Sequence, residues 1–264
     1  MKKYFKLRGE LSSTSNTTIG LIGLLFFSSM WLLISQMGWL PKTILPHPFD
    51  VIASYKTLHF EKFLVRNIAY SIKLNYLGYL EAVAIAVPVG FIIGLFPFFR
   101  ALLSKYVDAA RFIPLTAVTG IFIAWFGIGN AMKIQFLAFG IFVYLLPIVV
   151  QRIAEVPKVY EQMVKTLGGT NWQSIRYVFV PHVMSKLFDD IRVIVAISWT
   201  YIIIAEMVNS QDGGIGAMIF AAARQSKYEQ VFALLLVIVL IGIIQDKIFL
   251  YLDKILFPHK HINK

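Results

Sequence analysis

Long apolar blocks dominate this sequence, and they restrict what the chain can fold into more than any other feature. An α-helix needs about 20 apolar residues to cross the hydrocarbon core of a membrane. Because backbone groups in hydrocarbon must be satisfied within the protein, we predict an all-α integral membrane protein with about six transmembrane helices. The approximate spans are 18–37, 67–97, 103–126, 131–152, 182–208 and 229–252.

Charge agrees with a membrane protein. Only 15% of the residues are charged, where a soluble domain has about 25%. The net charge of +11 is spread along the chain, which favours topology-setting Lys and Arg over a nucleic-acid surface. Lysine and arginine counting predicts that both termini lie in the cytoplasm. We expect one transmembrane domain over 1–264, with cytoplasmic segments at 1–17, 153–181 and 253–264.

Two loops between the spans have recognisable local signals. After Pro48 we expect a short interfacial helix that turns Phe49, Ile52 and Tyr55 toward lipid. Glycines between Asp212 and Gly216 predict a turn with close packing.

One glycine pair lies inside a predicted span. Gly90 and Gly94 are four residues apart, which predicts close approach of two helices.

A polar segment, 157–181, interrupts the apolar pattern and reads as two short helices joined by a hinge. Pro157 suits the first turn of a helix. Gly168 and Gly169 supply a left-handed stop. Thr170 and Gln173 form a capping-box pattern that starts a second helix. Pro181 marks the start of the next segment and should push Val180 away from helical geometry.

Ionisable residues within the apolar spans form a second group of candidates, because an unpaired charge in hydrocarbon is costly. They either line a polar solute path or form ion pairs. We favour pairing for Asp108 with Arg111 and for Asp189 with Arg192, while both interpretations stay open for Glu206. The candidates are Lys73, Glu81, Asp108, Arg111, Arg192 and Glu206.

Signatures of catalysis are missing from the sequence. It contains no phosphate-binding P-loop, no zinc-protease motif, no hydrolase nucleophile motif and no cysteine. Its five histidines lack metal-ligand spacing. We therefore predict neither an enzyme nor a metal or cofactor site.

The polar segment resembles the cytoplasmic coupling loop (EAA loop) of permease subunits of bacterial ABC importers. In that family, Gly is followed after nine residues by a motif ending in Pro, as Gly168 is here by Val178-Phe179-Val180-Pro181. Gln162-Met163-Val164 replaces the usual Glu-Ala-Ala triplet. Further stretches are similar to the nitrate/sulfonate/taurine/bicarbonate branch in sequence and in order. They are Leu45-Pro-His-Pro48, Arg111-Phe-Ile-Pro114, Ala124-Trp-Phe-Gly-Ile-Gly129, Asp190-Ile-Arg192, Ser198-Trp199, Ala205-Glu-Met207 and Gly214-Ile-Gly216.

This resemblance implies a type I ABC importer-like fold and a permease subunit that forms the path for a small solute, such as nitrate, bicarbonate or a sulfonate. It also implies cytoplasmic ATPase subunits, a second permease subunit in a homodimer, and an extracytoplasmic solute-binding protein. ATP hydrolysis would then occur on a separate chain, and the resemblance implies a place in the bacterial inner membrane. The residues expected to contact the ATPase are Lys165, Thr166, Leu167, Gly168, Gly169, Trp172 and Pro181.

Two other functions are compatible with a helical membrane protein. A secondary transporter would use an ion gradient, but it would favour repeated halves with broken helices, which the sequence does not show. A non-transport membrane scaffold would work without an ATPase. The polar segment could also lie on lipid as an amphipathic helix, although its paired-helix pattern favours docking on a protein.

Overall fold

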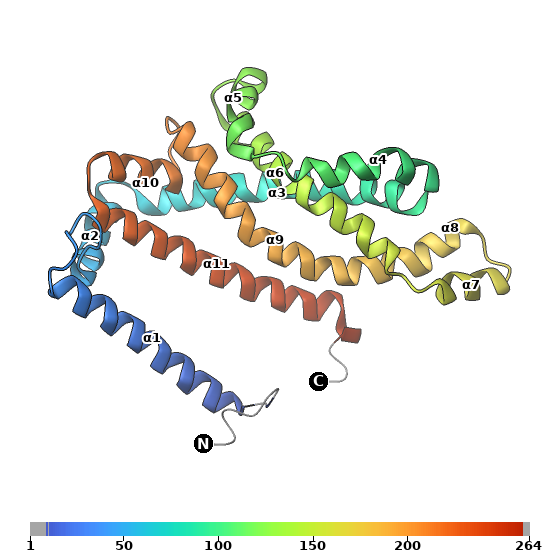
Figure 1. Ribbon diagram of the computed structural model, residues 1–264, viewed down its shortest axis with the longest axis horizontal. Coiled ribbons are helices and arrows are strands. Elements are labelled where there is room, and N and C mark those ends of the chain that lie inside the picture. Colours follow the sequence, from blue (N-terminus) through green and yellow to red (C-terminus); the bar gives the residue numbers. More distant parts are fainter. Residues whose placement is uncertain (1–8, 10, 261–264) are drawn as a thin grey trace. The chain divides into compact units, whose positions relative to one another are not determined.

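The computed structural model describes residue 9 and residues 11–260, and helices are the only regular elements in that part of the chain (Figure 1). The all-α prediction is therefore confirmed. Most of the expected N-terminal tail and residues 261–264 lie outside the described residues. The chain divides into two compact units, 1–62 with 222–233 and 63–221 with 234–264.

The first unit contains α1 (Ser13–Gln36), α2 (Pro48–Phe60) and the start of α11 (Tyr228–Leu256). The expected helix after Pro48 is present. Phe49 and Ile52 are exposed, as predicted. The prediction for Tyr55 is wrong, because its side chain is half-buried and its hydroxyl donates to the Ala233 carbonyl at 2.9 Å. A phenol can turn inward because it has a polar partner there.

Three long helices form the core of the second unit: α3 (Leu64–Leu95), α6 (Asn130–Ala154) and α9 (Val180–Val208). At about 1.5 Å per residue, α3 is about 48 Å long, more than a bilayer core requires. α6 packs against both other helices and fully buries Phe136, Leu137 and Ile141. Tyr79 of α3 donates to the Ile191 carbonyl of α9 at 2.8 Å, which joins these two helices.

The predicted close approach at Gly90 and Gly94 is confirmed between α3 and α6. A Cβ atom at Gly90 would lie 2.5 Å from Val149 Cγ1, and one at Gly94 would lie 2.6 Å from Ile153 Cδ1. Gly120 behaves differently, because nothing lies within 4 Å of a Cβ built there. Gly90 and Gly94 therefore allow α3 and α6 to pack closely, whereas Gly120 on α5 has no such role.

A substitution tests this packing. Gly90→Val should destabilise the protein by about 1–3 kcal/mol, because the added atoms overlap Val149. The midpoint of thermal unfolding in detergent should fall by roughly 3–10 °C. Gly120→Val is the matched control and should not lower the midpoint, since its site is open and glycine is already a poor residue inside a helix. An unchanged midpoint for Gly90→Val would contradict the close contact.

The expected span over 103–126 is not one continuous helix. The structure has two helices there, α4 (Pro97–Ala110) and α5 (Leu115–Phe126), bent by 105°. Pro114 explains the break, because it lacks a backbone N–H and pushes Ile113 away from helical geometry. Five helices in the described chain are long and apolar enough to cross a membrane, or six if α4 and α5 form one bent span.

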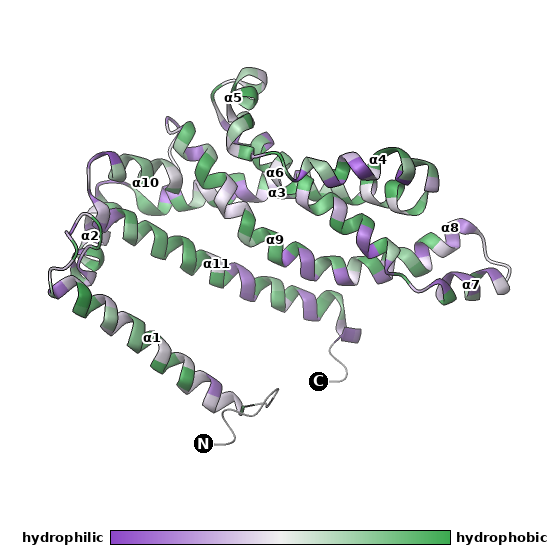
Figure 2. Cartoon of the chain, in the orientation of Figure 1, coloured by the Kyte–Doolittle hydropathy of each residue, from purple (hydrophilic) through white to green (hydrophobic). Residues whose placement is uncertain are grey.

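The remaining elements are short. α7 (Lys158–Thr166), α8 (Asn171–Ser174) and a π-helical turn, η1 (Ile175–Phe179), lie between α6 and α9. α10 (Ile215–Arg224) follows the glycine-rich loop and was not predicted; η2 (Pro258–Lys260) follows α11. Figure 2 shows α7 and α8 as more hydrophilic than the long helices.

Candidate functional site

The polar segment forms a helix, a sharp turn and a second helix, as predicted. α7 begins after Pro157, which lies one position before the first helical turn and not within it. Gly168 has a left-handed φ of +75°, and the Gly169 N–H donates to the Val164 carbonyl at 2.8 Å. A Cβ at Gly169 would lie 2.5 Å from Val164 Cγ1, so the returning chain passes close to α7. Glycine is needed at 168 for conformation and at 169 for space.

The second half of the segment differs from the prediction at Pro181. The capping box is confirmed, because the Gln173 N–H donates to Thr170 Oγ1 at 3.3 Å and the Thr170 N–H donates to Gln173 Oε1 at 2.7 Å. Val180, however, is helical, with φ −60° and ψ −53°. Its N–H bonds to the Ile175 carbonyl, five residues back. This wider turn accommodates Pro181 in the first turn of α9, where no N–H is needed, so the helix continues without interruption.

Apolar side chains stand exposed around the turn. Leu167 is 86% exposed and Trp172 is 66% exposed, and Val159 and Met163 on α7 are also exposed. Clustered exposed apolar side chains on an otherwise polar segment indicate a surface that a partner covers. Lys165 and Thr166 have local bonds within α7: Lys165 Nζ lies 2.5 Å from Glu161 Oε1, and Thr166 Oγ1 donates to the Gln162 carbonyl.

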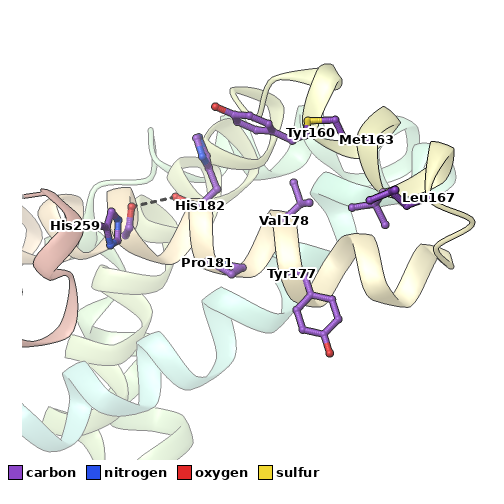
Figure 3. A pocket seen from close by; sticks show the side chains of 10 residues that line it. Tyr160, Met163, Leu167, Tyr177, Val178, Pro181, His182 and His259 are labelled. Atoms are coloured by element: carbon purple, nitrogen blue, oxygen red, sulfur yellow. Dashed lines mark hydrogen bonds between the residues drawn. The ribbon is translucent and has the colours of Figure 1, made fainter.

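A hollow of about 440 Å³ lies between α7 and the start of α9 (Figure 3). Tyr160, Met163 and Leu167 line it from α7, and Val178 and Pro181 line it from η1 and α9. The two helices therefore do not pack tightly on each other. An apolar hollow beside exposed Leu167 offers a place for a partner's side chain.

An ion-pair cluster fastens the base of this segment to the membrane helices. Arg152 near the end of α6 donates to both carboxylate oxygens of Asp190 on α9, each at 2.7 Å, and to Glu155 at 2.7 Å. The Arg152 hydrogen bond holds the pKa of Glu155 below its usual range, although burial opposes the shift. Glu155 is therefore ionised at neutral pH. The cluster joins the residues on both sides of the segment, so the segment can move together with α6 and α9.

Glu206, near the C-terminal end of α9, holds neighbouring helices together. Its side chain is fully buried and accepts bonds from Ser71 Oγ at 2.7 Å and from the Gly216 N–H at 2.8 Å. A Cβ at Gly214 would collide with this carboxylate, which explains the glycine there. Asn67 Oδ1 accepts from the Gly214 N–H at 2.7 Å. Glu206 thus connects α3, α9 and the start of α10, and the predicted turn with close packing is confirmed.

Lys133 was missed as a candidate by sequence reasoning. It lies in the first turn of α6 and is fully buried. Its ammonium is 3.1 Å from the Tyr70 hydroxyl, 3.4 Å from Asp212 Oδ2 and close to the Tyr70 ring. Its signal was its place inside the predicted apolar span 131–152, because an unpaired charge is costly there.

The other predicted residues are dispersed. Asp108 and Arg111 form the expected pair, at 3.7 Å. The expected pairing of Asp189 with Arg192 is wrong, because Arg192 donates to both oxygens of Asp246 on α11, at 2.5 and 2.8 Å. A long arginine side chain can reach the neighbouring helix, where two parallel bonds are stronger than one offset pair on the same helix.

Glu81 and Lys73 both lie on α3 but do not pair with each other. Glu81 accepts two bonds from Gln135 Nε2 of α6, at 2.8 and 2.9 Å. Lys73 is exposed. The structure therefore does not bring the six ionisable candidates into one cluster, and the segment around Gly168 is the best-defined site.

Together, the long apolar helices and the exposed helix–turn–helix segment characterise a helical membrane protein. Comparison with known families gives the class. Residues 86–257 match the family described as binding-protein-dependent transport system inner membrane component. Since this match covers more than half of the chain, the protein belongs to that family of ABC transporter permeases.

Curated relatives agree. A putative ABC transporter permease of Methanocaldococcus jannaschii is 28% identical over 84% of this chain and 80% of its own length. A putative aliphatic sulfonates transport permease of Bacillus subtilis is 26% identical over 86% and 82%. The taurine transport system permease of Escherichia coli is 24% identical over 91% and 88%. These relatives support the branch that the sequence motifs indicated.

Solved structures show the same fold. A chain of the MetNI methionine ABC transporter in an inward-facing conformation superposes with a TM-score of 0.64 at 19% identity, covering 72% of this chain and 94% of its own. A chain from an amino acid ABC transporter with histidines gives 0.57 at 16% identity, covering 78% and 97%. The prediction of a type I ABC importer-like fold is confirmed.

Proposed function

We propose that this permease couples to separate cytoplasmic ATPase subunits through residues 157–181. The single observation that carries this is the exposed apolar turn around Leu167, held rigidly by Gly168 and the Thr170 capping box. A short amphipathic helix presented in this way fits into a groove on a partner protein. The sequence contains no P-loop, so ATP hydrolysis is assigned to the partner.

The contact residues in this proposal have different tasks. Leu167 and Trp172 supply buried apolar area, and Gly168 and Gly169 set the angle of the turn. Lys165 and Thr166 border the contact, and Pro181 lies where the segment continues into α9. Because Arg152 joins α6 to α9, movement of the docked segment would tilt these helices as a rigid body.

The proposed assembly has two copies of this chain, two ATPase subunits and an extracytoplasmic solute-binding protein. The chain acts as one transmembrane domain over 1–264 in the inner membrane, with both termini in the cytoplasm. The names of the sulfonate and taurine relatives support a small organic anion, a sulfonate above all, as the solute. The ionisable candidates then either line the solute path or form pairs that hold helices together, and for Glu206 we favour the second role. They are Lys73, Glu81, Asp108, Arg111, Arg192 and Glu206.

Reconstitution tests this function. The purified chain alone in proteoliposomes should hydrolyse no ATP and take up no sulfonate. With its ATPase subunits, its binding protein and ATP, uptake of a radiolabelled sulfonate should appear. The control contains ADP and an imposed proton or sodium gradient. Uptake in that control without ATPase subunits would overturn the proposal and indicate a secondary transporter.

A further inference from the structure

A second hollow, of about 380 Å³, lies between α4 and the C-terminal half of α6. Its polar lining consists of Gln151 from α6 and, from α4 and its C-terminal end, Arg100, Ser104, Asp108 and Arg111. Neither Arg100 nor Arg111 lines the hollow beside Leu167. Its composition carries an inference of its own.

The positive charge in this hollow exceeds the negative charge. Arg111 faces Asp108, but the 3.7 Å separation is long and both side chains are about half exposed, so the pair is weak. Arg100 donates to the neutral Gly94 carbonyl. Within the described residues, no carboxylate pairs with Arg100. Two guanidiniums and one carboxylate leave a net positive site with free N–H donors.

Ser104 adds an unmet hydrogen bond. Its Oγ atom is buried and has no partner among the described residues. A buried hydroxyl without a partner costs free energy, which a bound acceptor would recover. The hydroxyl lines the same hollow as both arginines, so all three donors can serve one oxyanion.

The rest of the wall is apolar. Val107, Pro147 and Ile148 line it, together with the ring of Tyr144. The hollow has hydrogen-bond donors on one part of its surface and apolar side chains on the rest. It therefore suits a ligand with an oxyanion head and a short hydrocarbon tail. A bare inorganic ion would leave the apolar part unfilled.

We propose that the α4–α6 hollow binds an organic oxyanion, a sulfonate or phosphate head with an apolar tail, through Arg100, Arg111 and Ser104. The ligand comes either from the transported solute, which rests on the proposed function, or from an anionic phospholipid. Arg100 also lines a smaller hollow of about 210 Å³ with Pro157, Lys158 and Glu161. The site therefore borders the segment that is proposed to couple to the ATPase.

Binding to the transporter assembled with its ATPase subunits tests the site. The probe is butane-1-sulfonate, titrated by calorimetry in nanodiscs of phosphatidylcholine, with no solute-binding protein present. Arg100→Gln combined with Arg111→Gln should weaken binding at least about tenfold, since two charge-assisted contacts are lost. Ser104→Ala should weaken it about threefold or more. Lys105→Gln with Arg66→Gln, which removes two charges outside the hollow, should leave binding unchanged.

The lipid source has its own measurement. Native mass spectrometry of the complex from phosphatidylglycerol nanodiscs should show retained lipid on the wild type and its loss from the arginine double variant. Loss of butane-1-sulfonate binding assigns the site to the solute, and loss of retained lipid alone assigns it to the phospholipid. If the double variant changes neither, the site does not exist. ATP-driven uptake by the wild type, measured on the same preparation, tests the proposed function separately.

Discussion

Gly168→Val is expected to reduce ATP-driven solute uptake at least about tenfold while the protein still inserts into the membrane. Gly168 has a φ of +75°, and a β-branched residue there costs about 1–2 kcal/mol or forces the turn to change. Either outcome moves Leu167 and Trp172 away from their positions in the docking surface. A loss of 1.4 kcal/mol in docking alone corresponds to tenfold weaker association. Uptake in proteoliposomes and co-purification of the ATPase measure the effect.

Gly168→Asn provides the matched control. Asparagine tolerates the left-handed region, and nothing lies within 4 Å of a Cβ at this position. It should therefore retain most of the uptake although it adds a larger polar side chain. Equal loss in both variants would show that bulk, and not backbone conformation, matters at the turn. Normal uptake with Gly168→Val would remove the turn from the coupling proposal.

Glu206→Ala is expected to have the largest effect on stability. The change leaves the Gly216 N–H without its acceptor and removes the carboxylate partner of Ser71 Oγ. Each unmet donor costs about 1–3 kcal/mol, so the protein should lose roughly 3–5 kcal/mol. The thermal unfolding midpoint should then fall by about 6–15 °C.

A conservative variant separates charge from hydrogen bonding at this position. Glu206→Gln keeps one carbonyl acceptor but places an amide group against one of the two donors, so an intermediate loss is expected. If Glu206 instead served mainly to contact solute, Glu206→Ala would lower uptake and leave the unfolding midpoint unchanged. That result would contradict its role in joining α3, α9 and α10.

Local features of this fold were predictable because they depend on neighbouring residues. The capping box at Thr170 and Gln173 and the stop at Gly168 follow from short-range stereochemistry. The contact at Gly90 joins α3 to α6, but the four-residue spacing of Gly90 and Gly94 on one helix indicated it. The break between α4 and α5 was also encoded locally, by Pro114, but the apolar run of 103–126 hid it. Hydropathy measures whether a segment can enter a membrane and does not report where its helix bends.

Contacts between distant residues could not be predicted in the same way. Arg192 and Asp246 are 54 positions apart, and only the packing of α9 beside α11 brings them together. The burial of Lys133 depends likewise on Tyr70 of α3 and on Asp212 after α9. At Pro181, the π-helical turn supplied a geometry that the ordinary preference of residues before proline did not anticipate. These features arise from tertiary structure.

Crosslinking at position 167 tests whether residues 157–181 dock on the ATPase, and the absence of cysteine from the sequence leaves one labelling site. Leu167→Cys carries the only thiol in the permease and can be labelled with a thiol-specific photo-crosslinker before assembly with the ATPase. Phe49→Cys, exposed on α2, is the control. Docking through residues 157–181 predicts a permease–ATPase adduct from position 167 and none from position 49. An active transporter that gives no adduct from position 167 would contradict docking through this segment.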